Sequence, residues 1–160
     1  MKKILFFISL VSLMFAAPIK NNSYFLGVSY DRMKINSFSN QYSITLGYYF
    51  YDPNIYRINN RIYLKESYTA GKNIFSTSAN LDWIVRNYSF LSPIVGVNAG
   101  YLSNKKGNIS TGFWGINLGL NGYINRYVDI DLIGVVKKGF NDKKLKKAIK
   151  EVSLGVNFNF

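Results

Sequence analysis

The amino-acid sequence predicts an all-β protein, an eight-stranded antiparallel up-and-down transmembrane β-barrel that follows an N-terminal signal peptide. Three observations predict this fold class. The chain begins with a charged and then apolar leader, and from Tyr24 onward apolar residues alternate with small polar ones. Its composition is rich in Tyr and Phe, with 13 and 12 residues, but holds only 3 Pro. Aromatic residues favour strands, and strict alternation marks a strand whose two faces meet different surroundings.

The first segment, residues 1–17, has the order of a secretory signal. Lys2 and Lys3 begin it, a short apolar run follows, and Ala16 and Ala17 supply small residues for cleavage. The apolar run is shorter than the ~20 residues that a helix needs to cross a bilayer. We therefore expect a leader that is cleaved after one of the two alanines, rather than a membrane anchor.

The rest of the chain, residues 18–160, contains eight alternating segments. We expect each to lie in a strand of about the 9–11 residues that a tilted strand needs to cross a bilayer. Their apolar positions recur at every second residue, in the order Tyr24 to Tyr30, Tyr42 to Phe50, Ile58 to Leu64, Phe75 to Val85, Val95 to Tyr101, Trp114 to Leu120, Val128 to Leu132 and Val152 to Phe160. An even number of strands is what bacterial barrels contain, and it places both termini at one side.

Turn residues separate these segments, and the connections alternate in character. The second, fourth and sixth connections, 52–56, 87–92 and 125–126, are short and flanked by Tyr or Phe. The first, third, fifth and seventh are expected to be longer and are rich in Lys, Asn, Ser and Gly. This alternation predicts periplasmic turns at one rim and extracellular loops at the other.

The chemistry of the two strand faces predicts which one points outward. The polar face carries mostly Gly, Ser and Asn, which suit the crowded interior of an eight-stranded barrel. The apolar face is rich in Tyr, Phe and Trp, as in a lipid-facing band with aromatic girdles. We expect the periplasmic girdle to contain Tyr48, Phe50, Tyr88, Phe90, Tyr123, Tyr127, Phe158 and Phe160. A soluble lipocalin-like barrel in the periplasm has the same alternation and is kept as a less favoured alternative.

Three stretches resemble the small outer-membrane β-barrels, a broad family that includes the OmpA transmembrane domain, OmpX and the opacity proteins. They are SPIVGVNAGY (92–101), GFWGINLGLNGYINRYVDIDL (112–132) and EVSLGVNFNF (151–160). The resemblance implies residence in the outer membrane of a Gram-negative bacterium. It also implies that Phe158 and Phe160 form the C-terminal signal that the barrel-assembly machinery reads.

Several charged residues fall on the inward face. They are Asp31, Arg61, Lys65, Asp82, Arg86, Asp129, Asp131 and Glu151. An enclosed charge is costly unless it is paired. We therefore expect an ion-pair network that plugs the lumen. A gated polar path for small ions is the sharper alternative, although eight-stranded barrels have interiors filled by side chains.

A second group of charges lies in the segment KKGFNDKKLKKAIK, which the strand count places outside the cell. Its lysines are Lys137, Lys138, Lys143, Lys144, Lys146, Lys147 and Lys150. The whole chain has 20 Lys and Arg against 8 Asp and Glu, a formal charge of +12. The loop is either a solvated basic segment or a contact for lipopolysaccharide phosphates and acidic polymers. Nucleic acid fits poorly with a leader and a lipid-facing barrel.

The composition also limits the function. The chain has no Cys and no His, so it lacks a thiol nucleophile and the commonest general base and metal ligand. No phosphate-binding loop or metal-ligand cluster is evident in the sequence. We therefore expect a non-enzymatic monomer without cofactor, in a structural or surface-interaction role, with a small porin-like channel as the runner-up.

Overall fold

The computed structural model of the chain describes residues 22–35, 37–51, 58–86, 90–104, 110–140 and 148–160. The expected leader, 1–17, lies outside the described residues. So do four lysines of the expected basic loop, namely Lys143, Lys144, Lys146 and Lys147.

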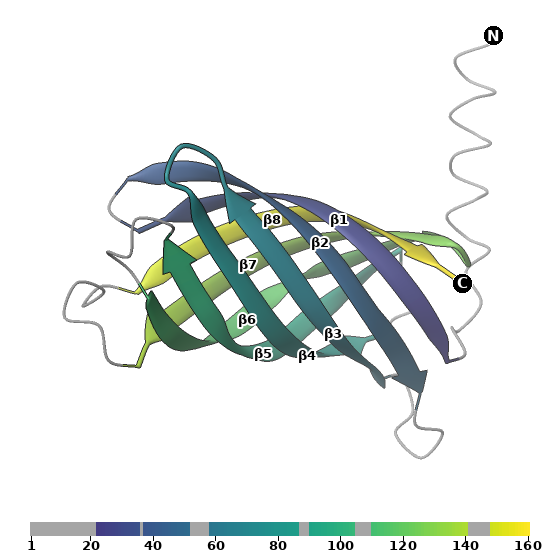
Figure 1. Cartoon of the computed structure of the whole chain (residues 1–160). Helices are drawn as coiled ribbons and strands as arrows, with labels where there is room; N and C mark the ends of the chain where they lie inside the picture. The colour runs from purple at the N-terminus through teal and green to yellow at the C-terminus, as the bar shows by residue number, and fades with distance from the viewer. Residues whose placement is uncertain (1–21, 36, 52–57, 87–89, 105–109, 141–147) are drawn as a thin grey trace, which may run out of the picture.

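The described residues form eight antiparallel strands that close into a barrel (Figure 1). The strands are β1 (Ser23–Lys34), β2 (Phe38–Tyr51), β3 (Ile58–Thr69), β4 (Ile74–Val85), β5 (Leu91–Asn104), β6 (Ser110–Asn125), β7 (Val128–Gly139) and β8 (Ile149–Asn159). Each strand pairs with the next along the chain, and β8 pairs with β1 to complete the ring. The predicted fold class is confirmed. No helix within the described part of the chain is long and apolar enough to cross a bilayer.

The barrel has two ends, which differ in the connections that they carry. Both β1 and β8 reach one end, where Tyr24 and Phe160 exchange two backbone hydrogen bonds of 3.0 and 3.1 Å. We call this the terminal end; it also carries the β2–β3, β4–β5 and β6–β7 connections. The opposite end carries the other four connections, and we call it the loop end (Figure 1).

The expected contrast between short turns and long loops is wrong for the first and third connections. The β1–β2 connection is only 35–37 and the β3–β4 connection only 70–73, whereas 52–57 joins β2 to β3. The reason is that the ladders continue beyond the apolar runs. Lys34 still pairs with Phe38 at the tip of the first hairpin, because polar residues can pair their backbone groups as well as apolar ones.

Local turn chemistry explains two of the connections. In 70–73, Gly71 and Asn73 have positive φ angles of 78° and 50°, a conformation open to Gly and tolerated by Asn. In the β6–β7 turn, the Asn125 side-chain oxygen accepts hydrogen bonds from the backbone N–H groups of Tyr127 and Val128, at 2.8 and 3.0 Å. These contacts close the turn that Asn125 and Arg126 predicted.

The outer wall of the barrel is a continuous apolar surface. Thirty large apolar side chains of the described residues are exposed on it, from Tyr24 on β1 to Phe160 after β8. Monomeric soluble proteins rarely expose apolar patches larger than a few hundred Å². Such a wall therefore needs lipid around it, which argues against a soluble periplasmic barrel.

The interior also holds aromatic and aliphatic side chains, which the expected Gly, Ser and Asn lumen did not include. One cluster contains Phe25, Tyr49, Tyr63, Ile84, Ile94, Ile133 and Val135, and a second near the loop end contains Met33, Ile74, Leu102, Phe113 and Ile149. Gly47 lies between Phe25 and Tyr63 in the register, and a Cβ there would lie 2.5 Å from atoms of both side chains. The missing side chain at Gly47 thus makes room for the Phe25 ring.

Candidate functional site

Arg61 on β3 is the centre of the first polar cluster inside the barrel. Its guanidinium group forms ion pairs with Asp82 on β4 at 2.7 Å and with Asp131 on β7 at 2.5 Å. It also donates a hydrogen bond of 3.2 Å to the Tyr49 hydroxyl and lies 4.9 Å from the centroid of the Tyr63 ring. Arg61 is 1% exposed. A single arginine therefore connects strands on opposite sides of the lumen.

Three aspartates of this cluster, Asp82, Asp129 and Asp131, also accept hydrogen bonds from uncharged side chains. The Tyr49 hydroxyl group donates to Asp129, and side-chain amides supply further donors. Asn121 donates to Asp129 at 3.0 Å and to Asp131 at 2.7 Å, and Asn157 donates to the same two carboxylates at 2.7 and 2.8 Å. These amides satisfy oxygen atoms that would otherwise be buried without a partner.

A second polar cluster lies closer to the loop end and is charge-balanced. Lys65 on β3 pairs with Asp31 at 3.0 Å and with Glu151 at 2.9 Å, and Lys137 pairs with Glu151 at 2.5 Å. The hydroxyl groups of Ser43 and Ser153 donate hydrogen bonds to Asp31. Two cations and two carboxylates, all buried, therefore neutralise one another.

The assignment of Lys137 to the basic loop is wrong. Lys137 belongs to β7 and faces the lumen, where it is 5% exposed. Lys137 is an even number of residues from Asp131, so the alternation of β7 turns both side chains toward the lumen. The backbone pairing with β8 extends as far as the Lys137–Ile149 pair, so this alternation continues through the whole strand. Lys138 and Lys150, also assigned to the loop, lie in β7 and β8 with exposed side chains.

Arg86 does not join either ion-pair cluster. It follows β4 at the terminal end, donates a hydrogen bond of 2.9 Å to Asn121 and lies 5.3 Å from the Tyr123 ring centroid. Tyr123 was expected in the outer girdle, and this is wrong, because the side chain is 4% exposed. Tyr123 lies two residues after Asn121 on β6, so its side chain faces the lumen as that of Asn121 does. Tyr88, of the same expected girdle, lies outside the described residues.

The space left between the polar clusters is small. One interior cavity of about 30 Å³ adjoins Arg61, Lys65 and Asp131, and another of about 20 Å³ adjoins Lys65, Lys137 and Glu151. A water molecule needs at least about 10–15 Å³ measured in this way, so each cavity has room for no more than a few waters. Within the described residues, no group of three or more acidic side chains is arranged to hold a metal ion.

The outer wall at the loop end carries a third charged group, which we call the basic strip. It consists of Arg32, Lys34, Lys138 and Lys150, all exposed, on the adjacent strands β7, β8 and β1. Lys34 and Lys150 are direct cross-strand partners. The charged groups of Arg32 and Lys34 lie 4.8 and 5.0 Å from the Phe38 ring centroid. Arg32 and Lys34 were not predicted as site residues, although their parity with Tyr24 and Tyr30 places them on the outer face.

The fold can be compared with known structures. No protein-family model and no curated protein sequence matches this chain. Neisserial surface protein A matches over 88% of this chain and 98% of its own, with 13% identity and a TM-score of 0.62. The N-terminal β-barrel domain of OprF from Pseudomonas aeruginosa matches over 88% and 98%, with 19% identity and a TM-score of 0.58. A de novo designed transmembrane β-barrel matches over 89% and 98%, with 12% identity and a TM-score of 0.53.

These likenesses and the lipid-facing wall together define an integral membrane β-barrel of the outer-membrane type. At identities below 20% the likeness concerns the fold alone. The role of this particular chain therefore depends on its own side chains.

Proposed function

We propose that the chain is a non-enzymatic outer-membrane protein whose basic strip binds the phosphate groups of lipopolysaccharide at the outer surface. The observation that carries the proposal is the cross-strand pair Lys34–Lys150, with Arg32 beside it on β1. Like charges directly opposite each other on a sheet are destabilising. An anionic partner offsets this repulsion, and phosphate accepts hydrogen bonds from both Lys and Arg.

The position of the strip supports a lipid rather than a soluble anion. Phe38, exposed beside Arg32 and Lys34, shares the outward face of β2 with Tyr42 and Ile44 of the apolar wall, and Asn40 lies between them. An amphiphile can therefore place acyl chains on the wall and phosphates on the strip at the same time. The loop lysines from Lys143 to Lys147 extend the basic character of the same segment in sequence.

The remaining parts of the proposal concern export and assembly. Residues 1–17 direct export and are removed, Phe158 and Phe160 are read by the barrel-assembly machinery, and the barrel acts as a monomer. Both phenylalanines are exposed on the outer wall at the terminal end, at 50% and 71%, where another protein can contact them. A porin-like channel is less favoured because the described interior cavities, of about 30 and 20 Å³, have room for only a few waters each.

The test compares lipopolysaccharide binding to the folded wild type and to the variant Arg32→Gln/Lys150→Gln, by native mass spectrometry in detergent. We expect the variant to bind about tenfold more weakly, since two charge-assisted hydrogen bonds are removed. Lys72→Gln is the matched control, because Lys72 is also a cation at the loop end but donates to the Ser37 carbonyl at 3.2 Å. Equal binding by wild type and the double variant would refute the role of the strip.

A further inference from the structure

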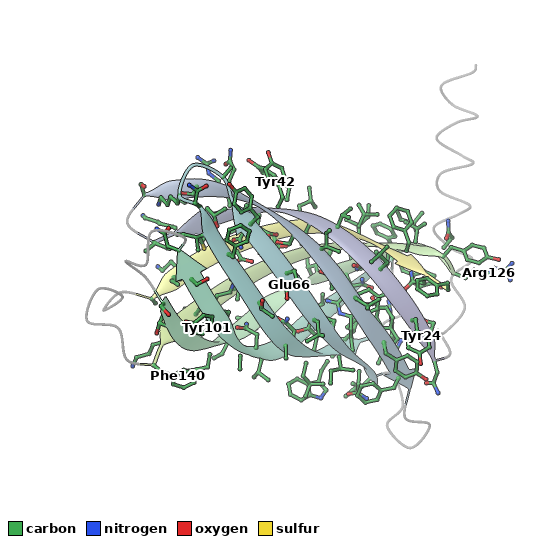
Figure 2. The ribbon with its side chains drawn as sticks, in the orientation of Figure 1. Tyr24, Tyr42, Glu66, Tyr101, Arg126 and Phe140 are labelled. Atoms are coloured by element: carbon green, nitrogen blue, oxygen red, sulfur yellow. The ribbon has the colours of Figure 1, made fainter. Side chains whose placement is uncertain are left out.

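Glu66 on β3 is an acidic side chain that faces the lipid. The other acids of the described strands, Asp31, Asp82, Asp129, Asp131 and Glu151, are buried in the lumen. Glu66 has the opposite parity on its strand from Arg61 and Lys65 and is exposed. Figure 2 shows it on the outer wall, between the loop end marked by Tyr101 and Phe140 and the terminal end marked by Tyr24 and Arg126.

The surroundings of Glu66 are mostly apolar. Its cross-strand partners are Ile44 on β2 and Thr77 on β4. The next outward positions toward the loop end are Tyr42, Tyr68 and Phe75, which pair with one another across the strands, and those toward the terminal end are Leu46, Leu64 and Ala79. Glu66 thus lies next to the row of aromatic rings, on the side of that row away from the loop end, within the apolar wall. An unpaired carboxylate is costly at this position.

Thr77 satisfies only part of this carboxylate. Its hydroxyl group donates a hydrogen bond of 2.8 Å to Glu66 Oε2. An ionised carboxylate has two oxygens and about four acceptor sites. Within the described residues, no Lys or Arg forms an ion pair with Glu66. The remaining acceptor sites therefore face the bilayer.

A groove of about 480 Å³ lies over Glu66 on the wall formed by β1 to β4. Its outward lining is made by Val28, Tyr42, Ile44, Glu66, Tyr68 and Phe75. The Tyr68 and Phe75 rings are 4.9 Å apart, and the Tyr68 hydroxyl donates to the Asn73 side chain at 2.9 Å. The aromatic edge of the groove is therefore held in place by its own contacts.

We propose that this groove binds a membrane lipid whose headgroup carries a primary ammonium. The ammonium donates to Glu66 in a charge-assisted hydrogen bond and lies near the faces of the Tyr42 and Tyr68 rings. The acyl chain of the lipid lies along Val28 and Ile44. This site is separate from the basic strip, since it accepts a cation and lies on other residues of the wall.

A lipid fits the groove better than a second copy of the chain does. The exposed cations of the basic strip, Arg32, Lys34, Lys138 and Lys150, lie at the loop end, beyond the row of aromatic rings. A two-fold contact centred on the groove brings two Glu66 carboxylates together rather than a carboxylate and a cation. An ammonium lipid offers both the missing charge and the apolar chain.

The experiment measures which lipid the folded protein retains from an equimolar mixture of phosphatidylethanolamine and phosphatidylcholine, by native mass spectrometry. We expect the wild type to retain phosphatidylethanolamine about fivefold over phosphatidylcholine, whose quaternary ammonium donates no such hydrogen bond, the size of one charge-assisted hydrogen bond. Glu66→Gln keeps the shape of the side chain and removes its charge, and we expect it to lose the preference. Arg126→Gln removes an exposed charge at the terminal end, outside both proposed sites, and is expected to keep the preference.

Folding of each variant is checked by the mobility difference between unboiled and boiled protein on a denaturing gel. If Glu66→Gln does not fold, Tyr68→Leu takes its place, because it removes one ring and leaves the carboxylate. The proposal is overturned if the folded variant keeps the preference, if phosphatidylcholine is retained as well as phosphatidylethanolamine, or if the wild type is a dimer that Glu66→Gln dissociates. Loss of lipopolysaccharide binding in the basic-strip variant with an unchanged lipid preference would separate the two proposals.

Discussion

The replacement of Arg61 by Met tests whether the ion pairs inside the barrel support its stability. The substitution removes the only arginine that pairs with Asp82 and Asp131 among the described residues and leaves both carboxylates enclosed. Removing one partner of a buried ion pair costs about 3–5 kcal/mol. Because Arg61 forms both ion pairs and is 1% exposed, we expect its replacement to cost about 4 kcal/mol, a factor of about 10³ in the folding equilibrium.

The assay is a urea titration of reversible folding in lipid vesicles, followed by tryptophan fluorescence. Trp83 and Trp114 are the only tryptophans, and both lie on the lipid-facing wall at 38% and 45% exposure, so their emission reports insertion. Arg126→Met is the matched control, because Arg126 is exposed in the β6–β7 turn, where its guanidinium group lies 4.5 Å from the Tyr127 ring centroid.

A compensating variant separates loss of charge balance from loss of packing. Asp82→Asn and Asp131→Asn, added to Arg61→Met, remove the unpaired carboxylates, and we expect most of the stability to return. Two results would refute the reasoning. One is a destabilisation below about 1 kcal/mol for Arg61→Met, the size of an exposed ion pair. The other is a triple variant that is no more stable than Arg61→Met.

The other predictions concern packing, conduction, assembly and export. Gly47→Ala places a methyl group against Phe25 and Tyr63 and should cost about 1–3 kcal/mol in the same titration, whereas Gly134→Ala, whose nearest atom would be 3.6 Å away, should be nearly neutral. Planar-bilayer recordings should show no stable unitary conductance, and steps that Arg61→Ala alters would favour the channel instead. Phe160→Ala should slow assembly in cells without lowering the stability of refolded protein, which a pulse-chase of the heat-modifiable form measures. The intact mass of mature protein should correspond to loss of the leader after Ala16 or Ala17; retention of the leader would contradict that expectation.

Much of the fold could be predicted because the alternation along each strand decides which of its side chains face the lumen and which face outward. The parity of Arg61, Asp82 and Asp131 follows from alternation alone, so the pattern already placed them inside. Their pairing could not be predicted, since it depends on which strands meet across the lumen. The same limit explains Lys137. Its position in the alternation pointed inward, but composition grouped it with the lysines that follow. Only the length of the β7–β8 ladder placed it in a strand, where its ammonium group pairs with Glu151.

The amino-acid pattern was sufficient to specify a transmembrane barrel, because period-two alternation is a local property of each strand and an apolar outer face needs lipid. Which interior carboxylates pair with Arg61 and which pair with Lys65 was decided only by the tertiary structure. The closure of the barrel sets the distances between strands that are far apart in the chain. The surroundings of Glu66 emerged in the same way, because the pairing of β3 with β2 and β4 decides which side chains lie beside it. The groove over that carboxylate exists because four neighbouring strands place aromatic rings on one side of it and aliphatic side chains on the other.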